Sequence, residues 1–131
     1  MQIIKGFNEK TFYEIAKKCG SKQLLSDVRY MRIPLFRKQE IYAERLDDIA
    51  IAMGVYSKHN TLRIVGIGVA DDKKNKGYGR YMLQMVIEQA RQRGIEQITT
   101  RTQSGCDFYM KYAGARIVGM ADEDYLLEID V

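Results

Sequence analysis

The chain has 131 residues, of which 46% are hydrophobic and 29% charged, and its formal net charge is +4. This length predicts one domain over residues 1–131, and the composition is that of an ordinary globular protein. No apolar run approaches the roughly 20 residues of a membrane span, and the first residues lack the apolar core of a signal peptide. Two cysteines and one histidine form neither a disulfide framework nor a metal-site spacing. We therefore expect a cytoplasmic protein with no bound metal and no membrane partner.

The positive charge is concentrated in the first third of the chain. Residues 1–38 carry nine Lys or Arg against three Asp or Glu, whereas residues 39–131 carry twelve against fourteen. A basic surface of this kind can attract RNA or an acidic substrate. The simpler interpretation, which we favour, is that these side chains form the solvated faces of two amphipathic helices.

The N-terminal part predicts a short strand followed by two helices. Residues 2–7 are rich in Ile and Phe, which favours a strand. Asn8 and Ser21 are candidate N-caps of two amphipathic helices. Pro34 predicts a loop over residues 32–39, because proline disfavours helical continuity. The predicted inward positions of the two helices are Phe12, Ile15, Ala16, Cys19, Leu24, Leu25, Val28 and Met31.

From residue 41 onward the pattern changes to strands. Residues 41–45, 49–57 and 61–70 predict an antiparallel meander with tight turns. Gly66 and Gly68 interrupt the third of these strands. Glycine inside a strand indicates a bulge or a close approach of other atoms to the backbone.

The remaining chain predicts alternating helices and strands. A helix ending at Arg93 and a strand over residues 95–100 follow, and this crossover makes the new strand parallel to the one before it. A short helix over residues 106–113 precedes a hairpin of residues 116–120 and 125–131. The order β-α-α-β-β-β-α-β-α-β-β predicts an α/β (α+β) fold. We expect a single mixed, mostly antiparallel twisted sheet flanked by helices.

The most informative stretch is the loop from Asp71 to Arg80, which joins an apolar strand to a helix. Gly77 and Gly79 permit positive φ and allow the backbone to approach a ligand closely. Backbone N–H groups and the positive end of the helix dipole attract an anion at such a place. The loop's cationic side chains Lys74, Lys76 and Arg80 add to this attraction.

From the residues alone, an anion site and an ordinary turn are equally favoured in this loop. Two nucleotide-binding motifs are excluded. The Gly-Lys-Ser/Thr of a Walker loop is absent, and Met82 stands where a Rossmann fingerprint needs a third glycine or alanine.

Three segments in the right order resemble the GNAT superfamily of N-acetyltransferases, and the resemblance covers nearly the whole chain. Lys74-Asn-Lys-Gly-Tyr-Gly79 is similar to that family's Arg/Gln-x-x-Gly-x-Gly/Ala loop, with Lys74 as a conservative departure. Val69-Ala-Asp-Asp72 stands where the family has Val-x-Pro-x. Phe108-Tyr-Met-Lys-Tyr-Ala-Gly-Ala115 resembles its Phe-Tyr-x-Lys-x-Gly-Phe segment, with Ala115 in place of the aromatic residue.

The resemblance implies acetyl-CoA, or another acyl-CoA, as donor and a primary amine as acceptor, with direct transfer in a ternary complex. It also implies that the two central parallel strands splay apart. Pantetheine would then pair with one strand's backbone, and the pyrophosphate would lie on the glycine loop. The cofactor-binding residues so implied are Ile67, Val69, Lys74, Asn75, Lys76, Gly77, Tyr78, Gly79 and Arg80.

Tyr109 matches the position of the family's tyrosine, which implies a general acid that protonates the departing CoA sulfur. The competing interpretation is a tyrosine that fills the core between helix and sheet. Tyr112, one turn away, is the competing phenol. The backbone N–H of Val69 is our candidate for stabilising the tetrahedral oxyanion.

A general base is harder to find, because residues 61–69 contain no carboxylate. Glu40, Glu44, Asp47 and Asp48 can act through water, but solvated surface charges are the simpler interpretation.

Cys106 has no adjacent base in the sequence, so a small buried residue is the simpler interpretation than a nucleophile. His59 lies in a predicted turn and is a weak base candidate, since a solvated polar residue is the default there.

Two alternatives to an amine acetyltransferase of ordinary type stay open. The missing base favours a non-catalytic acyl-CoA-binding module. The basic N-terminal helices, with Lys17, Lys18 and Lys22, allow an acetyltransferase that acts on an aminoacyl-tRNA amine. Neither the acceptor nor the choice between monomer and homodimer has a sequence signature.

Overall fold

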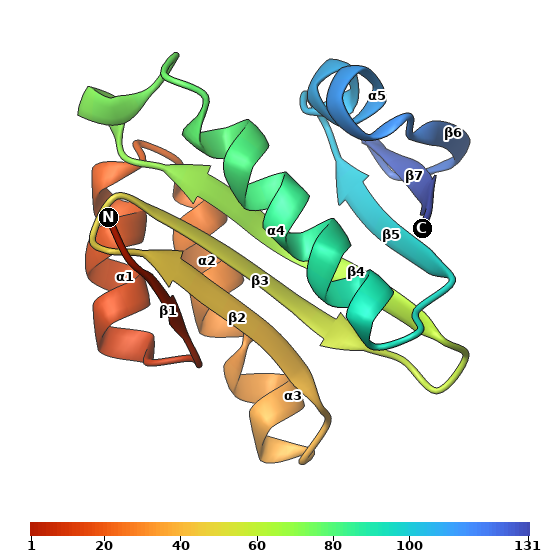
Figure 1. The fold of residues 1–131 in the computed structure, drawn as a ribbon, viewed down its shortest axis with the longest axis horizontal. Helices are drawn as coiled ribbons and strands as arrows, with labels where there is room; N and C mark the ends of the chain where they lie inside the picture. Colours follow the sequence, from red (N-terminus) through yellow and green to blue (C-terminus); the bar gives the residue numbers. More distant parts are fainter.

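The computed structural model describes residues 1–131 as an open seven-stranded sheet with helices on both faces (Figure 1). The elements in chain order are β1 (Ile3–Lys5), α1 (Glu9–Lys18), α2 (Lys22–Tyr30), α3 (Arg32–Phe36), β2 (Ile41–Leu46), β3 (Ala50–Tyr56), β4 (Thr61–Val69), η1 (Asp71–Lys73), α4 (Tyr78–Gln92), β5 (Gln97–Thr102), α5 (Cys106–Ala113), β6 (Arg116–Ala121) and β7 (Asp124–Asp130). The strand order is β1-β2-β3-β4-β5-β7-β6, and β4 and β5 are the one parallel pair. The predicted mixed, mostly antiparallel sheet is therefore confirmed.

Two apolar clusters hold the layers together, one on each face of the sheet. α4 and α5 cover one face, where Leu62, Ile64 and Ile98 of the central strands are buried. α1 and α2 cover the other face and bury Phe12 and Val28 against β3. None of the helices combines the length and apolar character needed to cross a membrane.

The two N-terminal helices begin as their sequence predicts. The Asn8 side chain accepts a hydrogen bond from the Thr11 N–H, and the Ser21 hydroxyl accepts one from the Leu24 N–H. Each bond satisfies a backbone donor that the first helical turn would otherwise leave free. The start of each helix is thus encoded locally.

The predicted loop over residues 32–39 is wrong in part, because Arg32–Phe36 forms the short helix α3. Pro34 is buried as the third residue of this helix. Proline is tolerated there because the first-turn N–H groups have no partner inside a helix. Pro34 therefore stops α2 from continuing but does not prevent a new turn in another direction.

The long helix also differs from its predicted extent. α4 begins at Tyr78, so Tyr78, Gly79 and Arg80 form its first turn and not the end of the loop. Gly77, with φ of 87°, is the residue that turns the chain into the helix. The apolar pattern misses this turn because Tyr78 is only half-buried and Arg80 is exposed.

The glycines of β4 were expected to mark either a bulge or a close approach of other atoms, and both features occur in this part of the strand. A register shift opposite Gly54 leaves Val65 as an extra residue in β4, which is a bulge. The glycines themselves allow a close approach of α2. A Cβ on Gly66 would lie 3.0 Å from the Leu24 side chain, and one on Gly68 only 2.2 Å from it.

Candidate active site

β4 and β5 pair over only four residues and then diverge (Figure 1). The parallel ladder ends at Ile64 and Thr100, although β4 continues to Val69 and β5 to Thr102. Beyond this point β5 is paired only with β7. The splayed central strands expected from the sequence are therefore present, and we call the point where they part the fork.

The unpaired edge of β4 exposes backbone hydrogen-bonding groups toward β5. The Ala70 N–H donates to the Ile49 carbonyl of the segment that leads into β3, at 2.7 Å. Since backbone groups along an antiparallel strand alternate in direction, Gly68 also bonds toward β3. The N–H and C=O groups of Ile67 and Val69 then point the other way, where β5 has left the sheet. Four backbone groups in a row thus lack a partner.

The glycine loop continues directly from this edge and presents a second set of free donors. Asn75 and Gly77 both have positive φ, 63° and 87°. No hydrogen bond is donated by the N–H groups of Tyr78, Gly79 and Arg80, and Gly77 has no side chain that can cap the helix. Free N–H groups at a helix start attract an anion.

The three cationic side chains of the loop have different surroundings. Lys74 donates to the Cys19 carbonyl at 3.0 Å and pairs with Asp71 at 2.7 Å, so it ties the loop to the end of α1. The Arg80 guanidinium lies 5.1 Å from the ring centre of Tyr112. Lys76 is exposed and has no ion pair. Two cations therefore stand beside the free N–H groups, and the third holds the loop in place.

Residues 10–115 match the acetyltransferase (GNAT) family. The chain belongs to the GNAT acetyltransferase family. It is accordingly an acyltransferase, and the motif resemblance read from its sequence is confirmed. No curated protein sequence matches the chain.

The fold of this GNAT protein is similar to that of solved acetyltransferases at low sequence identity. The PaiA N-acetyltransferase of Thermoplasma acidophilum, in complex with coenzyme A, is 14% identical with a TM-score of 0.74, and all of both chains is covered. A Bacillus subtilis acetyltransferase in complex with CoA is 20% identical over 99% of this chain and 98% of that one, with a TM-score of 0.71. The ribosomal-protein-S18-alanine N-acetyltransferase of Escherichia coli is 11% identical over 99% and 93%, with a TM-score of 0.75.

Tyr109 of this GNAT protein lies on α5 beside the end of the parallel ladder, where its phenol interacts with the Thr100 side chain. The residue is only 8% exposed, and its ring contacts Phe108 edge-on, with centroids 5.2 Å apart. Burial raises the pKa of the phenol, the interaction with Thr100 opposes that rise, and the negative charge of Asp27 adds to it. Tyr109 therefore packs in the core and also adjoins the fork. Tyr112 is half-buried beneath Arg80.

The base candidates named from the sequence lie away from the fork. Glu40 pairs with Arg93, and Asp48 pairs with Lys18 at 3.1 Å. Glu44 was expected on the surface. That prediction is wrong, because the residue is only 2% exposed. It faces the α4 side from β2, two strands away from β4.

The two other side chains considered for chemistry are no better placed. His59 is exposed in the turn before β4. Cys106 is half-buried at the start of α5, and its thiol makes no hydrogen bond.

One carboxylate at the fork, Asp27, is not among the base candidates predicted from the sequence. Asp27 of α2 is half-buried, and its Oδ2 would lie 2.9 Å from a Cβ on Gly66. A sequence signal for it exists, since Asp27 is the only acidic residue between Glu14 and Glu40 and follows Leu24 by three positions on the inward face of its helix.

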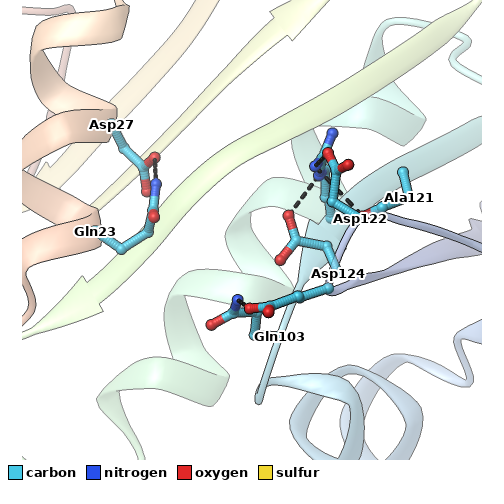
Figure 2. Close-up of polar contacts among 8 residues, drawn as sticks. Gln23, Asp27, Gln103, Ala121, Asp122 and Asp124 are labelled. Carbon is cyan, nitrogen blue, oxygen red and sulfur yellow. Dashed lines mark hydrogen bonds and ion pairs between the residues drawn. The ribbon is translucent and has the colours of Figure 1, made fainter.

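Polar contacts hold the diverging end of β5 on the far side of the fork. Arg101 binds Asp124 at 2.5 Å and Asp122 at 3.1 Å, and Gln103 donates to Glu123 at 3.2 Å. Figure 2 shows these contacts on one side of β4 and Asp27 with its partner Gln23 on the other. The turn between β6 and β7 is thus tied to the end of β5 that no longer pairs with β4.

Proposed function

We propose that this GNAT protein transfers the acetyl group of acetyl-CoA to a primary amine by direct attack in a ternary complex. The observation that carries the proposal is the continuity of two unpaired backbone stretches, the edge of β4 at Ile67 and Val69 and the start of α4. Pantetheine amides can pair with the first, and a pyrophosphate can accept from the second. One extended CoA thioester satisfies both. The CoA complexes of two structural neighbours support this donor.

We assign the pyrophosphate to the loop from Lys74 to Arg80 and the pantetheine to Ile67 and Val69. The N–H groups of Tyr78, Gly79 and Arg80 donate to the phosphates, because they donate no bond within the protein. The turns at Asn75 and Gly77 direct them outward, and Lys76 and Arg80 add positive charge. The role of Lys74 is to hold the loop against α1.

The chemistry requires an oxyanion donor and a proton for the thiolate. The Val69 N–H, which points toward the fork, is assigned to the oxyanion, and the Val69 C=O and the Ile67 backbone are left to pair with pantetheine. Tyr109 is assigned as the general acid, because its raised pKa keeps the phenol protonated at neutral pH and able to donate to sulfur.

Direct transfer is supported by the state of the two thiols. Cys19 donates to the Ile15 carbonyl, and burial raises the pKa of its thiol to about 11. Such a thiol is protonated and a poor nucleophile. No base is hydrogen-bonded to Cys106. Neither cysteine is therefore prepared for an acyl-enzyme intermediate.

Calorimetry with acetyl-CoA tests the donor assignment, and the absence of binding at high micromolar concentration would contradict it. Release of CoA thiol with a panel of primary amines then tests the transfer. The panel includes a peptide with an N-terminal alanine and an aminoglycoside, because acetyltransferases of both kinds share the fold. Binding of acetyl-CoA without thiol release for any amine would favour the non-catalytic acyl-CoA-binding module.

An aminoacyl-tRNA acceptor has less support. Of the three lysines that would contact RNA, Lys17 pairs with Glu14 and Lys18 pairs with Asp48, each at 3.1 Å. Only Lys22 is exposed without an ion pair. Salt-sensitive RNA binding that weakens when all three lysines are neutralised would restore this acceptor class.

A further inference from the structure

Asp27 is a partly buried carboxylate without a counter-ion. It is half-buried on the face of α2 that packs on β4, and it forms no ion pair. Its single hydrogen-bond partner is the Gln23 side chain, whose amide Nε2 donates to Oδ1 at 2.9 Å (Figure 2). Burying a carboxylate without a cation is unfavourable, so its position needs a reason other than stability.

The arginines of α2, α3 and β4 are engaged with groups other than Asp27. On α2 itself, Arg29 donates to the Tyr13 hydroxyl, and the neighbouring Arg32 of α3 binds Glu9. On β4, Arg63 donates to the Tyr30 hydroxyl. The titratable group that faces Asp27 from α5 is Tyr109, and it is neutral. One oxygen of Asp27, Oδ2, is left without a donor.

That free oxygen lies at the fork. Oδ2 would be 2.9 Å from a Cβ on Gly66, which is the second residue after the ladder ends at Ile64. Tyr109 approaches the same point from the opposite face of the sheet, at Thr100, the last ladder residue of β5. Burial is the main cause of the raised pKa of the Tyr109 phenol, and the negative charge of Asp27 adds to the rise.

We propose that Asp27 is the general base of the reaction and accepts the proton of the incoming acceptor ammonium group. This inference rests on the proposed function. A primary ammonium that enters from the α2 side gives one proton to the free Oδ2 of Asp27 and becomes a neutral amine. The amine lone pair then forms the C–N bond to the thioester carbonyl carbon held near Val69.

The remaining bonds and protons balance with the groups present. As the tetrahedral intermediate collapses, the C–S bond breaks and sulfur takes the phenolic proton of Tyr109. The nitrogen loses its second proton through solvent, and this proton restores the phenol. The proton on Asp27 passes to water, so the products are the amide, CoA thiol and one released proton. Gln23 acts as a positioning residue, because it orients the carboxyl through Oδ1.

The ionisation of Asp27 suits this role. Burial raises the pKa of the carboxyl to about 6, and the Gln23 hydrogen bond opposes the rise. A base with a pKa near the working pH is ionised in the free enzyme yet basic enough to take a proton. An exposed carboxylate, with an ordinary pKa near 4, would be a weaker base.

The experiment compares Asp27→Asn with Glu14→Gln, a control that also removes one carboxylate, in this case from an exposed position on α1. Steady-state rates are measured from pH 5 to pH 9 with the best amine of the panel. We expect Asp27→Asn to lower kcat about 10²-fold or more and to abolish the loss of rate below about pH 6. Glu14→Gln should leave both unchanged, and acetyl-CoA affinity should be the same in all three proteins.

Gln23→Leu provides a variant that keeps the carboxylate. Since the Gln23 hydrogen bond lowers the pKa of Asp27, its loss should move the acidic limb of the rate profile to higher pH while the rate on the plateau is largely retained. A purely structural role of Asp27 would not move this limb. An unmoved limb in Gln23→Leu would overturn the assignment.

Failure of the inference is distinguishable from failure of the proposed function. If the wild-type protein does not bind acetyl-CoA, both are wrong. If the wild type transfers acetyl groups and Asp27→Asn does so equally fast with the same pH profile, only the assignment of Asp27 is wrong. If the wild type binds acetyl-CoA but releases thiol with no amine of the panel, the proposed function fails and the assignment of Asp27 fails with it.

Discussion

Gly68 of β4 and Leu24 of α2 are packed so closely that a Cβ on Gly68 would lie 2.2 Å from Leu24 Cδ2. The absence of that atom is what lets α2 settle onto the unpaired end of β4. Asp27 follows Leu24 by one helical turn, so the same contact sets the distance between its carboxyl and the backbone at Gly66. A packing relationship between two apolar positions thus determines where a charged group meets the fork.

Gly68→Ala should therefore destabilise the protein, since the new methyl group overlaps with Leu24. We expect a loss of about 1–3 kcal/mol in the free energy of unfolding, measured by urea titration. Gly119→Ala is the matched control, because a Cβ there meets Leu126 at an ordinary 3.7 Å, and its effect should stay within about 0.5 kcal/mol. Equal stability of the two variants would mean that α2 can shift freely on β4.

Lys74 and Lys76 should differ in what their loss affects. Lys74→Met removes the hydrogen bond to the Cys19 carbonyl and should lower the free energy of unfolding by about 1 kcal/mol. Lys76→Met removes an exposed charge without a partner, so stability should be unchanged. Its acetyl-CoA affinity should fall about fivefold, and less at high salt. Urea titration and calorimetry separate the two effects. If Lys74→Met lost acetyl-CoA affinity and kept its stability, Lys74 would contact the phosphates instead.

Tyr109→Phe and Tyr112→Phe form a pair that tests the general acid. Loss of the Tyr109 hydroxyl should reduce kcat about 10²-fold while acetyl-CoA affinity is kept, because the proton matters only when the C–S bond breaks. Since burial raises the pKa of this phenol, the wild-type rate should persist well into alkaline solution. Tyr112→Phe should retain nearly full kcat. A variant Tyr109→Phe as fast as wild type would make Tyr109 a core residue only.

Asp27→Asn should stabilise the protein even though it impairs catalysis. The pKa of this carboxyl is about 6 in the folded chain, above the 3.8 of an unperturbed Asp, so the folded state holds the proton more tightly. Its stability then falls as the pH rises from about 4 to about 6, and the penalty is complete above that range. Asparagine avoids the charge, and because the site is partly open to water we expect a gain of about 1–2 kcal/mol at pH 8.

Urea titrations at pH 8 and pH 4 check this expectation, since most of the gain should be lost at pH 4, where the carboxyl is neutral in the folded state and already partly protonated in the unfolded one. Glu44, whose pKa burial also raises, titrates in both proteins and cancels in the comparison. Glu14→Gln should change stability by less than about 0.5 kcal/mol at either pH. A loss of stability in Asp27→Asn at pH 8 would instead show that the folded protein stabilises the charged carboxylate.

Much of the fold could be predicted because its signals are local. The caps Asn8 and Ser21 begin their helices as expected, and the crossover after the glycine loop makes β4 and β5 parallel. The predicted loop at Pro34 was wrong because a proline in the first turn of a helix has no backbone hydrogen bond to lose. The sequence rule that proline breaks helices does not distinguish this first turn from the helix interior. Glu44 was misplaced because a charged side chain normally indicates solvent, and α4 covers this one.

The sequence by itself predicted the donor half of the proposed site, because a strand, a glycine loop and a helix start are contiguous in the chain and carry their chemistry in the backbone. Only the tertiary structure brought together the residues that we propose for the acceptor half. Asp27, Gly66 and Tyr109 are separated by about forty residues each, and no periodicity relates them. They meet because β4 leaves β5 after Ile64 and because two glycines let α2 pack against the exposed edge. Whether residues so far apart in the chain come together depends on how the helices pack on the sheet, and local sequence propensities do not encode that packing.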